Sequence, residues 1–209
     1  MRMQMKWMRS TLLLVGSAAL CGAQSYAQTD VALSIYGAFN GTTTANGVTQ
    51  SPSNAAGGLL EVRHISHPWL GYEGTYSFNR ANQTYRYTSP PSCLAGSTEP
   101  CGLQAVSANA HELTGDWIAS VKVANLRPFA LAGGGLIFDV PSSGQSTSTT
   151  SKPVFVYGAG LDWGLLPHIG LRFQYRGNLY KAPDLTSLFT STDKFTHTAE
   201  PMIGAYLRF

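Results

Sequence analysis

The chain has 209 residues, of which 12% are charged and 11% aromatic, and it carries 22 glycines. The charged share is about half that of an average soluble domain. The net charge of +3 arises from Arg2, Lys6 and Arg9 near the N-terminus; the rest of the chain has 11 residues of each sign. Binding of nucleic acid by a basic surface therefore loses its support.

Residues 1–27 predict a cleavable secretory signal peptide. Three cationic residues precede the short apolar run Thr11–Cys21, and Ser25-Tyr26-Ala27 offers a small-x-small cleavage site before Gln28. The run is about half of the roughly 20 residues that a membrane-spanning helix needs. A lipoprotein signal ending at Cys21 is the alternative, but Leu20 departs from the small residue expected before such a cysteine. We expect one mature domain, residues 28–209.

Alternation of apolar and polar residues at period two predicts strands along almost the whole mature chain. In residues 169–180, for example, Leu171 and Phe173 alternate with Arg172. Eight strands are expected, at Val31–Asn40, Gly57–Ser66, Leu70–Asn79, Ala110–Val123, Pro128–Phe138, Pro153–Trp163, Ile169–Tyr180 and Thr196–Phe209.

The expected connections alternate in length. Long polar segments lie at 41–56, 80–109, 139–152 and 181–195, and short turns lie at 67–69, 124–127 and 164–168. With both termini at the short-turn end, this is the loop rule of outer-membrane barrels. A soluble secreted ligand-binding barrel is the alternative, but it would carry many charges on its outer face. Here the few charges collect on one strand face, which favours a membrane barrel.

The final strand gives the pattern a family resemblance. Ile203, Ala205 and Leu207 are apolar, Arg208 falls on the other face, and Phe209 ends the chain. The chain resembles the small bacterial outer-membrane β-barrels of the OmpA-like and OmpX-like type, whose last strand commonly ends in Phe. This resemblance implies an all-β, eight-stranded antiparallel up-and-down transmembrane β-barrel in a Gram-negative outer membrane. The periplasmic domain of full OmpA-type proteins is not expected.

The resemblance also implies partners. The barrel is expected to be a monomer surrounded by outer-membrane lipid and lipopolysaccharide. The barrel-assembly machinery is expected to recognise the C-terminal strand, with Phe209 as the assembly signal.

Charged residues on the inward strand face predict an ionic network in the lumen. An eight-stranded barrel is only wide enough for side chains to fill, and an unpaired buried charge costs several kcal/mol. The charges must therefore pair across the lumen, as a permanent plug or as a gate of a narrow pore. The expected members are Glu73, Glu112, Arg172, Arg176, Glu200 and Arg208, with Glu61 or Arg63 according to the register of residues 57–66.

Other chemistry-bearing residues receive structural interpretations. Cys93 and Cys101 are expected to form a disulfide in a surface loop, since a thiolate metal site would need further ligands. Gly133-Gly134-Gly135 lacks the Lys-Ser/Thr of a phosphate loop and predicts close packing in a curved strand. The five histidines show no metal-ligand spacing, so no metal, cofactor or catalytic residue is expected.

Aromatic residues near strand ends predict girdles at the two membrane interfaces. They are Trp69, Trp117, Trp163, Tyr72, Tyr76, Tyr175, Tyr180 and Tyr206. The expected function is a structural or surface-interaction barrel with a plugged lumen and long extracellular loops. A small passive, porin-like pore for ions or hydrophilic solutes is the alternative. An enzyme is not expected.

Overall fold

The computed structural model describes residues 27–88, 103–142, 147–186, 189 and 191–209. The predicted signal peptide lies outside the described residues except for Ala27, and the predicted disulfide partners Cys93 and Cys101 lie outside them as well. Among the described residues, no helix is long and apolar enough to cross a membrane.

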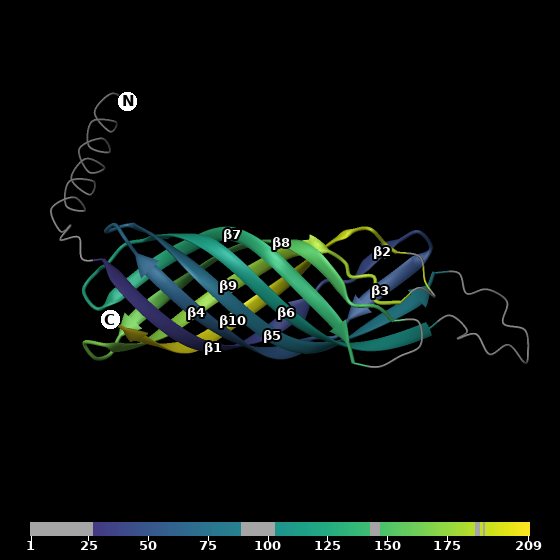
Figure 1. Cartoon of the computed structure of the whole chain (residues 1–209), viewed down its shortest axis with the longest axis horizontal. Coiled ribbons are helices and arrows are strands. Elements are labelled where there is room, and N and C mark those ends of the chain that lie inside the picture. Colours follow the sequence, from purple (N-terminus) through teal and green to yellow (C-terminus); the bar gives the residue numbers. More distant parts are fainter. Residues whose placement is uncertain (1–26, 89–102, 143–146, 187–188, 190) are drawn as a thin grey trace, which may run out of the picture.

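The described part of the chain contains ten strands, eight of which pair in a closed circle. Figure 1 shows them wound into an elongated barrel. The barrel strands are β1 (Gln28–Asn40), β4 (Ala55–Ile65), β5 (Leu70–Tyr87), β6 (Leu103–Ser120), β7 (Leu126–Pro141), β8 (Thr150–Gly164), β9 (Ile169–Lys181) and β10 (Phe195–Arg208). The remaining two, β2 (Thr43–Ala45) and β3 (Val48–Pro52), form a hairpin beyond the barrel wall.

The sheet closes on itself. Each barrel strand pairs antiparallel with its neighbours in the chain, through β4–β5, β5–β6 and so on to β9–β10. β1 completes the circle by pairing with β4 on one side and with β10 on the other, for example through Ile35↔Ile203. Closure leaves no unpaired edge among the eight barrel strands, which is the condition for spanning lipid with strands. The predicted eight-stranded up-and-down antiparallel barrel is confirmed.

Three predicted loops were wrong in part, because regular pairing continues into them. In the predicted loop 139–152, β7 and β8 remain paired as far as Asp139↔Thr150. β5 and β6 remain paired as far as Arg86↔Leu103, although residues 80–109 were expected to form a loop. The predicted loop 41–56 contains the β2–β3 hairpin, which turns at Asn46 and Gly47 with φ angles of 51° and 75°. Asn-Gly is a favoured pair for such a tight turn because both residues accept positive φ. We call this end of the barrel the extended end, and the opposite one the short-turn end.

The barrel has its polar residues inside and its apolar residues outside. Ile35 and Trp117 are 69% and 65% exposed on the outer face, whereas Arg63, Arg172 and Arg176 are fully buried in the lumen. A soluble protein has the reverse arrangement, because burial of apolar surface drives its folding. This exterior matches a lipid environment instead.

Of the eight residues predicted for the aromatic girdles, six face outward as a girdle requires and two do not. Trp69, Trp117, Trp163, Tyr72, Tyr76 and Tyr175 are exposed on the outer face. Tyr180 and Tyr206 are buried in the lumen, at 6% and 2% exposure. Both occupy even-numbered positions in β9 and β10, on the same strand face as Arg172 and Glu200, so the period-two rule assigns them to the interior.

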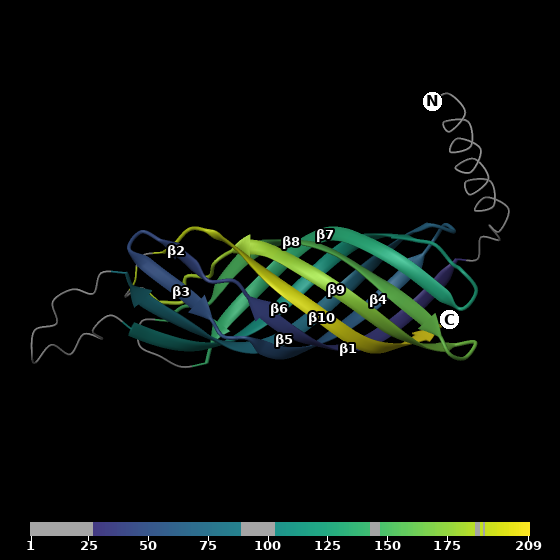
Figure 2. The same ribbon diagram turned by 180° about the vertical axis from the view of Figure 1, so that it is seen from behind.

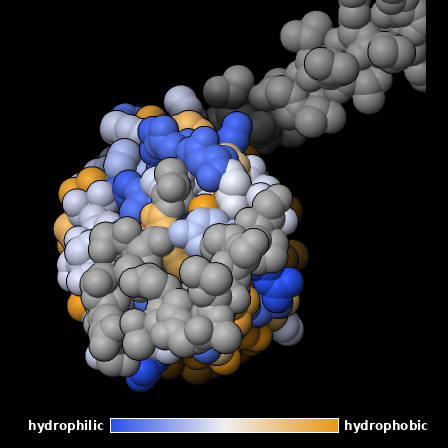
Figure 3. Space-filling model, turned by 90° about the vertical axis from the view of Figure 1, so that its right-hand side faces the viewer, coloured by the Kyte–Doolittle hydropathy of each residue, from blue (hydrophilic) through white to orange (hydrophobic). Residues whose placement is uncertain are grey.

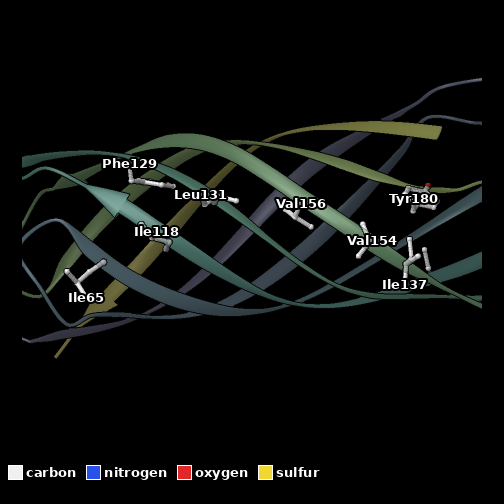
Figure 4. Packing of buried hydrophobic residues seen from close by; sticks show 9 residues of the cluster. Ile65, Ile118, Phe129, Leu131, Ile137, Val154, Val156 and Tyr180 are labelled. Carbon is white, nitrogen blue, oxygen red and sulfur yellow. The ribbon is translucent and has the colours of Figure 1, made fainter. Parts of the chain in front are cut away.

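A band of apolar side chains runs along the length of the lumen. Figure 4 shows these side chains, which come from several strands, along the inside of the barrel. The cluster contains Ile65, Ala110, Ile118, Phe129, Leu131, Ile137, Val154, Val156 and Tyr180. The interior of the barrel is therefore filled by apolar as well as polar side chains.

The inward-facing glycines of β7 permit close strand packing. A Cβ added at Gly135 would collide with the Leu113 carbonyl oxygen and lie 2.7 Å from Thr114 Cα, whereas one added at Gly74 would meet nothing within 4 Å. Overpacking a filled interior costs about 1–3 kcal/mol. We expect Gly135→Ala to lower the free energy of unfolding in lipid vesicles by about that amount. Gly74→Ala is the matched control and should leave it unchanged; equal effects would contradict the packing role.

Candidate functional site in the lumen

Two buried arginines and four carboxylates form the layer of the lumen nearest the short-turn end. Arg172 Nε lies 2.7 Å from Asp162 Oδ1, and its Nη2 lies 2.8 Å from Asp30 Oδ1. Its Nη1 also reaches Glu61 Oε2 at 3.4 Å. One guanidinium therefore joins carboxylates from three strands, β1, β4 and β8.

Asp162 links this arginine to a second one. Arg63 donates from Nη1 to Asp162 Oδ2 at 3.2 Å, and from Nη2 and Nε to Glu73 Oε2 at 2.8 and 2.9 Å. The Arg63 guanidinium also stacks on Phe129, 4.0 Å from the ring centroid. Such cation–π contact compensates part of the lost hydration of a buried guanidinium. Carboxylates and arginines therefore alternate across this layer of the lumen.

Arg176 forms a separate layer farther toward the extended end. Its Nη2 lies 3.3 Å from Glu112 Oε1 and 3.7 Å from Asp116 Oδ2. The Thr75 and Thr114 hydroxyls each accept a hydrogen bond from it at 3.1 Å. Asn178 supports the layer by donating to Glu112 Oε2 at 2.9 Å. This arginine thus meets both ionised and neutral acceptors.

The structure brings four of the six residues expected in the network into ion pairs. Glu73 and Arg172 lie in the first layer, and Glu112 and Arg176 lie in the second. Glu200 is buried beside Glu112 around a small cavity of about 20 Å³, without an ion pair to another described residue. Figures 1 and 2 show the strands of both layers crossing the same central part of the barrel.

Arg208 departs from the expected network. It lies at the short-turn end, stacks on Tyr206 at 5.0 Å and donates to the Tyr206 hydroxyl at 3.1 Å. The alternation of Arg208 with the apolar Leu207 correctly predicted that Arg208 lies on the inner face of the strand. Its position near the end of β10, however, places it beyond the ion-pair layers.

Sequence reasoning left out two carboxylates that the first layer depends on. Asp30 lies one residue before the predicted first strand, and Asp162 is next to the last residue of the predicted strand 153–163. Neither was among the expected members of the network. Continuing the alternation from Val31 or Trp163 by one position would have placed both carboxylates inside. Glu61 and Arg63 are both buried in the lumen, since residues two apart share a strand face.

A segment between β9 and β10 covers the extended end of the lumen. The Pro183 carbonyl accepts hydrogen bonds from Gln50 Nε2 and from the Tyr85 hydroxyl, both at 2.9 Å. The backbone N–H of Leu185 donates to the same hydroxyl at 3.2 Å. Leu185 is fully buried with Val48 and Val106. We call residues 182–186 the cap; Figure 3 views this end of the molecule, where hydrophilic side chains gather along part of the rim.

The chemistry of the remaining polar groups is limited. Among the described residues, no group of three His, Cys, Asp or Glu side chains is positioned to hold a metal ion. His111 and His197 contact the hydroxyls of Tyr76 and Tyr157 at 2.9 and 3.0 Å on the outer face. The first pair joins the neighbouring strands β5 and β6, whereas Tyr157 on β8 reaches across Gly177 of β9 to His197 on β10.

Comparison with known proteins gives similarity in structure only. No protein-family model matches the chain, and no curated protein sequence matches it. Among solved structures, the attachment invasion locus protein Ail of Yersinia pestis, in complex with the heparin analogue sucrose octasulfate, is 18% identical with a TM-score of 0.52. The match covers 88% of this chain and 99% of Ail.

Two other solved structures agree with this result. Neisserial surface protein A (NspA) is 12% identical over 87% of this chain and 97% of its own, with a TM-score of 0.53. The outer-membrane protein OprG of Pseudomonas aeruginosa is 10% identical over 88% of this chain and 97% of its own, with a TM-score of 0.60.

The closed sheet, apolar exterior and ion-paired interior define the chain as a transmembrane β-barrel. More particularly, it has the eight-stranded fold of the small outer-membrane barrels represented by Ail, NspA and OprG. The resemblance expected from the sequence is confirmed at the level of the fold.

Removing one buried arginine should destabilise the barrel strongly. Arg172→Met leaves the Asp30 carboxylate without its ion-pair partner, and breaking a buried pair in this way costs about 3–5 kcal/mol. We expect a loss of that size in urea unfolding from lipid vesicles, and a similar loss for Arg176→Met. Unchanged stability in both variants would contradict the interior network.

Lys181→Met is the surface control. Lys181 Nζ lies 2.6 Å from Asp193 Oδ1, and this exposed ion pair lowers the pKa of the Asp193 carboxyl through the hydrogen bond and the lysine charge. Exposed pairs contribute little to stability. We expect this variant to return the pKa of Asp193 toward its ordinary value, measured by NMR titration, without a detectable change in unfolding.

Loss of the Tyr85 hydroxyl should loosen the cap. Tyr85→Phe leaves the Leu185 N–H without its acceptor, which costs about 1–3 kcal/mol for a buried group. We expect chymotrypsin to cleave the cap of the folded barrel about tenfold faster, a change equivalent to roughly 1.4 kcal/mol. Tyr157→Phe, which removes an exposed hydroxyl, is the control. Equal cleavage of both variants would show that this hydroxyl does not hold the cap.

The cap should resist alkaline pH. Burial raises the pKa of the Tyr85 phenol well above its ordinary value of about 10. A raised folded-state pKa means that the neutral phenol keeps donating to Pro183 below pH 10, and that this stabilisation is lost only as the pH rises through the folded-state value. Cap cleavage should therefore stay constant from pH 7 to 9.

Proposed function

We propose that this chain is an integral protein of the bacterial outer membrane and serves as a structural, surface-exposed scaffold. One observation carries this proposal: the lumen is closed by two layers of buried ion pairs and covered at the extended end by the cap. The shared fold with Ail, NspA and OprG and the apolar exterior support the location. A soluble ligand-binding barrel fits poorly, since it would expose Ile35 and Trp117 to water.

In the proposed orientation, the short-turn end faces the periplasm and the extended end faces the outside. Figure 2 shows the beginning of β1 and the C-terminus at the short-turn end and the β2–β3 hairpin at the other. Long loops of outer-membrane barrels are extracellular and short turns periplasmic. The extended end would then present the β2–β3 hairpin and the continuation of β5 and β6 to other molecules. Ail, named as an attachment protein, offers a structural parallel for such surface contact.

The proposed partners are outer-membrane lipid and lipopolysaccharide around the apolar wall, and the assembly machinery at the C-terminal strand. The backbone N–H of Phe209 donates to the Thr29 carbonyl at 2.8 Å, while its side chain is 76% exposed. The terminal residue is therefore anchored through its backbone and keeps its ring accessible for recognition. We propose that the barrel is a monomer and performs no catalysis.

A passive pore is the second candidate, because the buried arginines of the two ion-pair layers could change partners. If Arg172 or Arg176 exchanged one carboxylate for another, a path through the lumen could open. Ion pairs that plug the barrel and ion pairs that gate it look alike in one static arrangement, so conduction has to be measured.

Conductance of refolded residues 28–209 in a planar lipid bilayer distinguishes the two functions. The scaffold proposal predicts no discrete current steps, although heat-modifiable gel mobility shows a folded barrel. Reproducible steps that change in amplitude or frequency in Arg176→Gln, but not in the surface variant Lys181→Gln, would establish the gated pore instead. Both variants must first show the mobility shift of a folded barrel.

A further inference from the structure

We propose that the short-turn end of the barrel contains a binding site for a small oxyanion of the phosphate type. A pocket of about 340 Å³ opens at this end, on the opposite side of the ion-pair layers from the cap. Two turns, at 123–126 and 164–168, form its rim and are joined by a hydrogen bond from the Gly164 N–H to the Asn125 carbonyl at 2.8 Å. The site does not depend on whether the lumen conducts.

The central residue of the site is Arg127. Its side chain lines the pocket and is only 8% exposed, yet its Nε and Nη1 have no hydrogen-bond partner within the described part of the chain. A buried guanidinium without acceptors is unusual, because leaving a charged donor unpaired costs more than leaving a neutral one. The unused donors point to an acceptor supplied from outside the chain.

The nearest carboxylate is already occupied. Arg127 and Asp162 are direct cross-strand partners on β7 and β8. Asp162 nevertheless accepts three hydrogen bonds from other arginines: two from Arg172, at 2.7 and 3.1 Å, and one from Arg63, at 3.2 Å. The Asp162 carboxylate is therefore already bound within the ion-pair layer. Among the residues that the structure describes, no other carboxylate lines the pocket.

Two further cations line the same pocket. Arg208 is held in place by Tyr206, and Lys122 lies exposed at the rim. Arg208 is the strongest charged neighbour of Arg127, and its like charge opposes the attraction from Asp162 and Asp30. Arg63 adds a second repulsion. An anion between Arg127 and Arg208 would convert this repulsion into two attractive contacts.

The chemistry of the ligand follows from these donors and from the size of the pocket. Guanidinium groups present paired N–H donors that match the oxygens of phosphate, and lysine adds a mobile point charge. The volume admits an inorganic phosphate or a phosphomonoester headgroup. Since free phosphate and a lipid headgroup share this chemistry, the experiment must separate the two sources.

The first experiment titrates inorganic phosphate into folded residues 28–209 in maltoside micelles free of phosphate, with binding followed by NMR shifts of arginine side chains. We expect saturable binding that weakens at least tenfold in Arg127→Gln and less in Arg127→Lys, which keeps the charge but loses the fork. Arg86→Gln removes an exposed arginine at the extended end and is the matched control. All variants are checked for the mobility shift of a folded barrel.

The outcomes are decisive in each case. Absence of saturable binding, or equal affinity in Arg127→Gln and the unchanged protein, would overturn the site. Nanodiscs then identify the source. Phosphate binding in both phosphatidylglycerol and phosphate-free glycolipid discs would assign the site to a dissolved anion. Binding in glycolipid discs alone would show that phospholipid headgroups occupy it in a membrane.

Discussion

The Asp162 carboxylate is the centre of the ion-pair network in the lumen. Its two oxygens accept from Arg63 and Arg172, and through these arginines it connects Glu73, Glu61 and Asp30. No two of these six residues are neighbours in the chain, so the network can form only when five strands have reached their final register. Buried ion pairs of this kind contribute little to the net free energy of folding. Their main effect is to select one strand register, since every shifted register leaves a charge unpaired.

The need to pair buried charges also explains why polar residues lie inside the barrel and apolar residues outside, the reverse of a soluble protein. In water, apolar surface is buried by the hydrophobic effect, but a wall in contact with lipid gains nothing from inward apolar groups. Ion pairs and hydrogen bonds in the lumen can therefore specify how the interior packs, while Ile35 and Trp117 face outward. The apolar band around Phe129 and Val156 shows that the interior is still filled closely, and Phe129 also receives the Arg63 guanidinium on its face.

Much of the fold was predictable because period-two alternation carries its information locally. Leu171, Arg172 and Phe173 each reveal their side of the wall without knowledge of any partner. Strand ends were less predictable: residues such as Gln83 and Val106 extend β5 and β6 only because they pair with each other across a long separation. The two ion-pair layers, the separate position of Arg208 and the cap could not be predicted in this way. They depend on the stagger between neighbouring strands, which fixes how far along the barrel axis each residue lies. The alternation of apolar and polar residues carries no information about this stagger.

The pairing of β1 with β10 has a topological consequence. Asp30 and Arg208 are opposite each other at the closing seam, so the beginning and the end of the barrel are adjacent in space. The closed sheet therefore has no intrinsic first strand, and a circularly permuted chain opened at the exposed Ser53–Asn54 connection could trace the same wall. In that chain Phe209 would keep its place in the structure but lose its place as the terminal residue. The permutation would thus separate the contribution of Phe209 to the folded barrel from its proposed role as a signal for assembly.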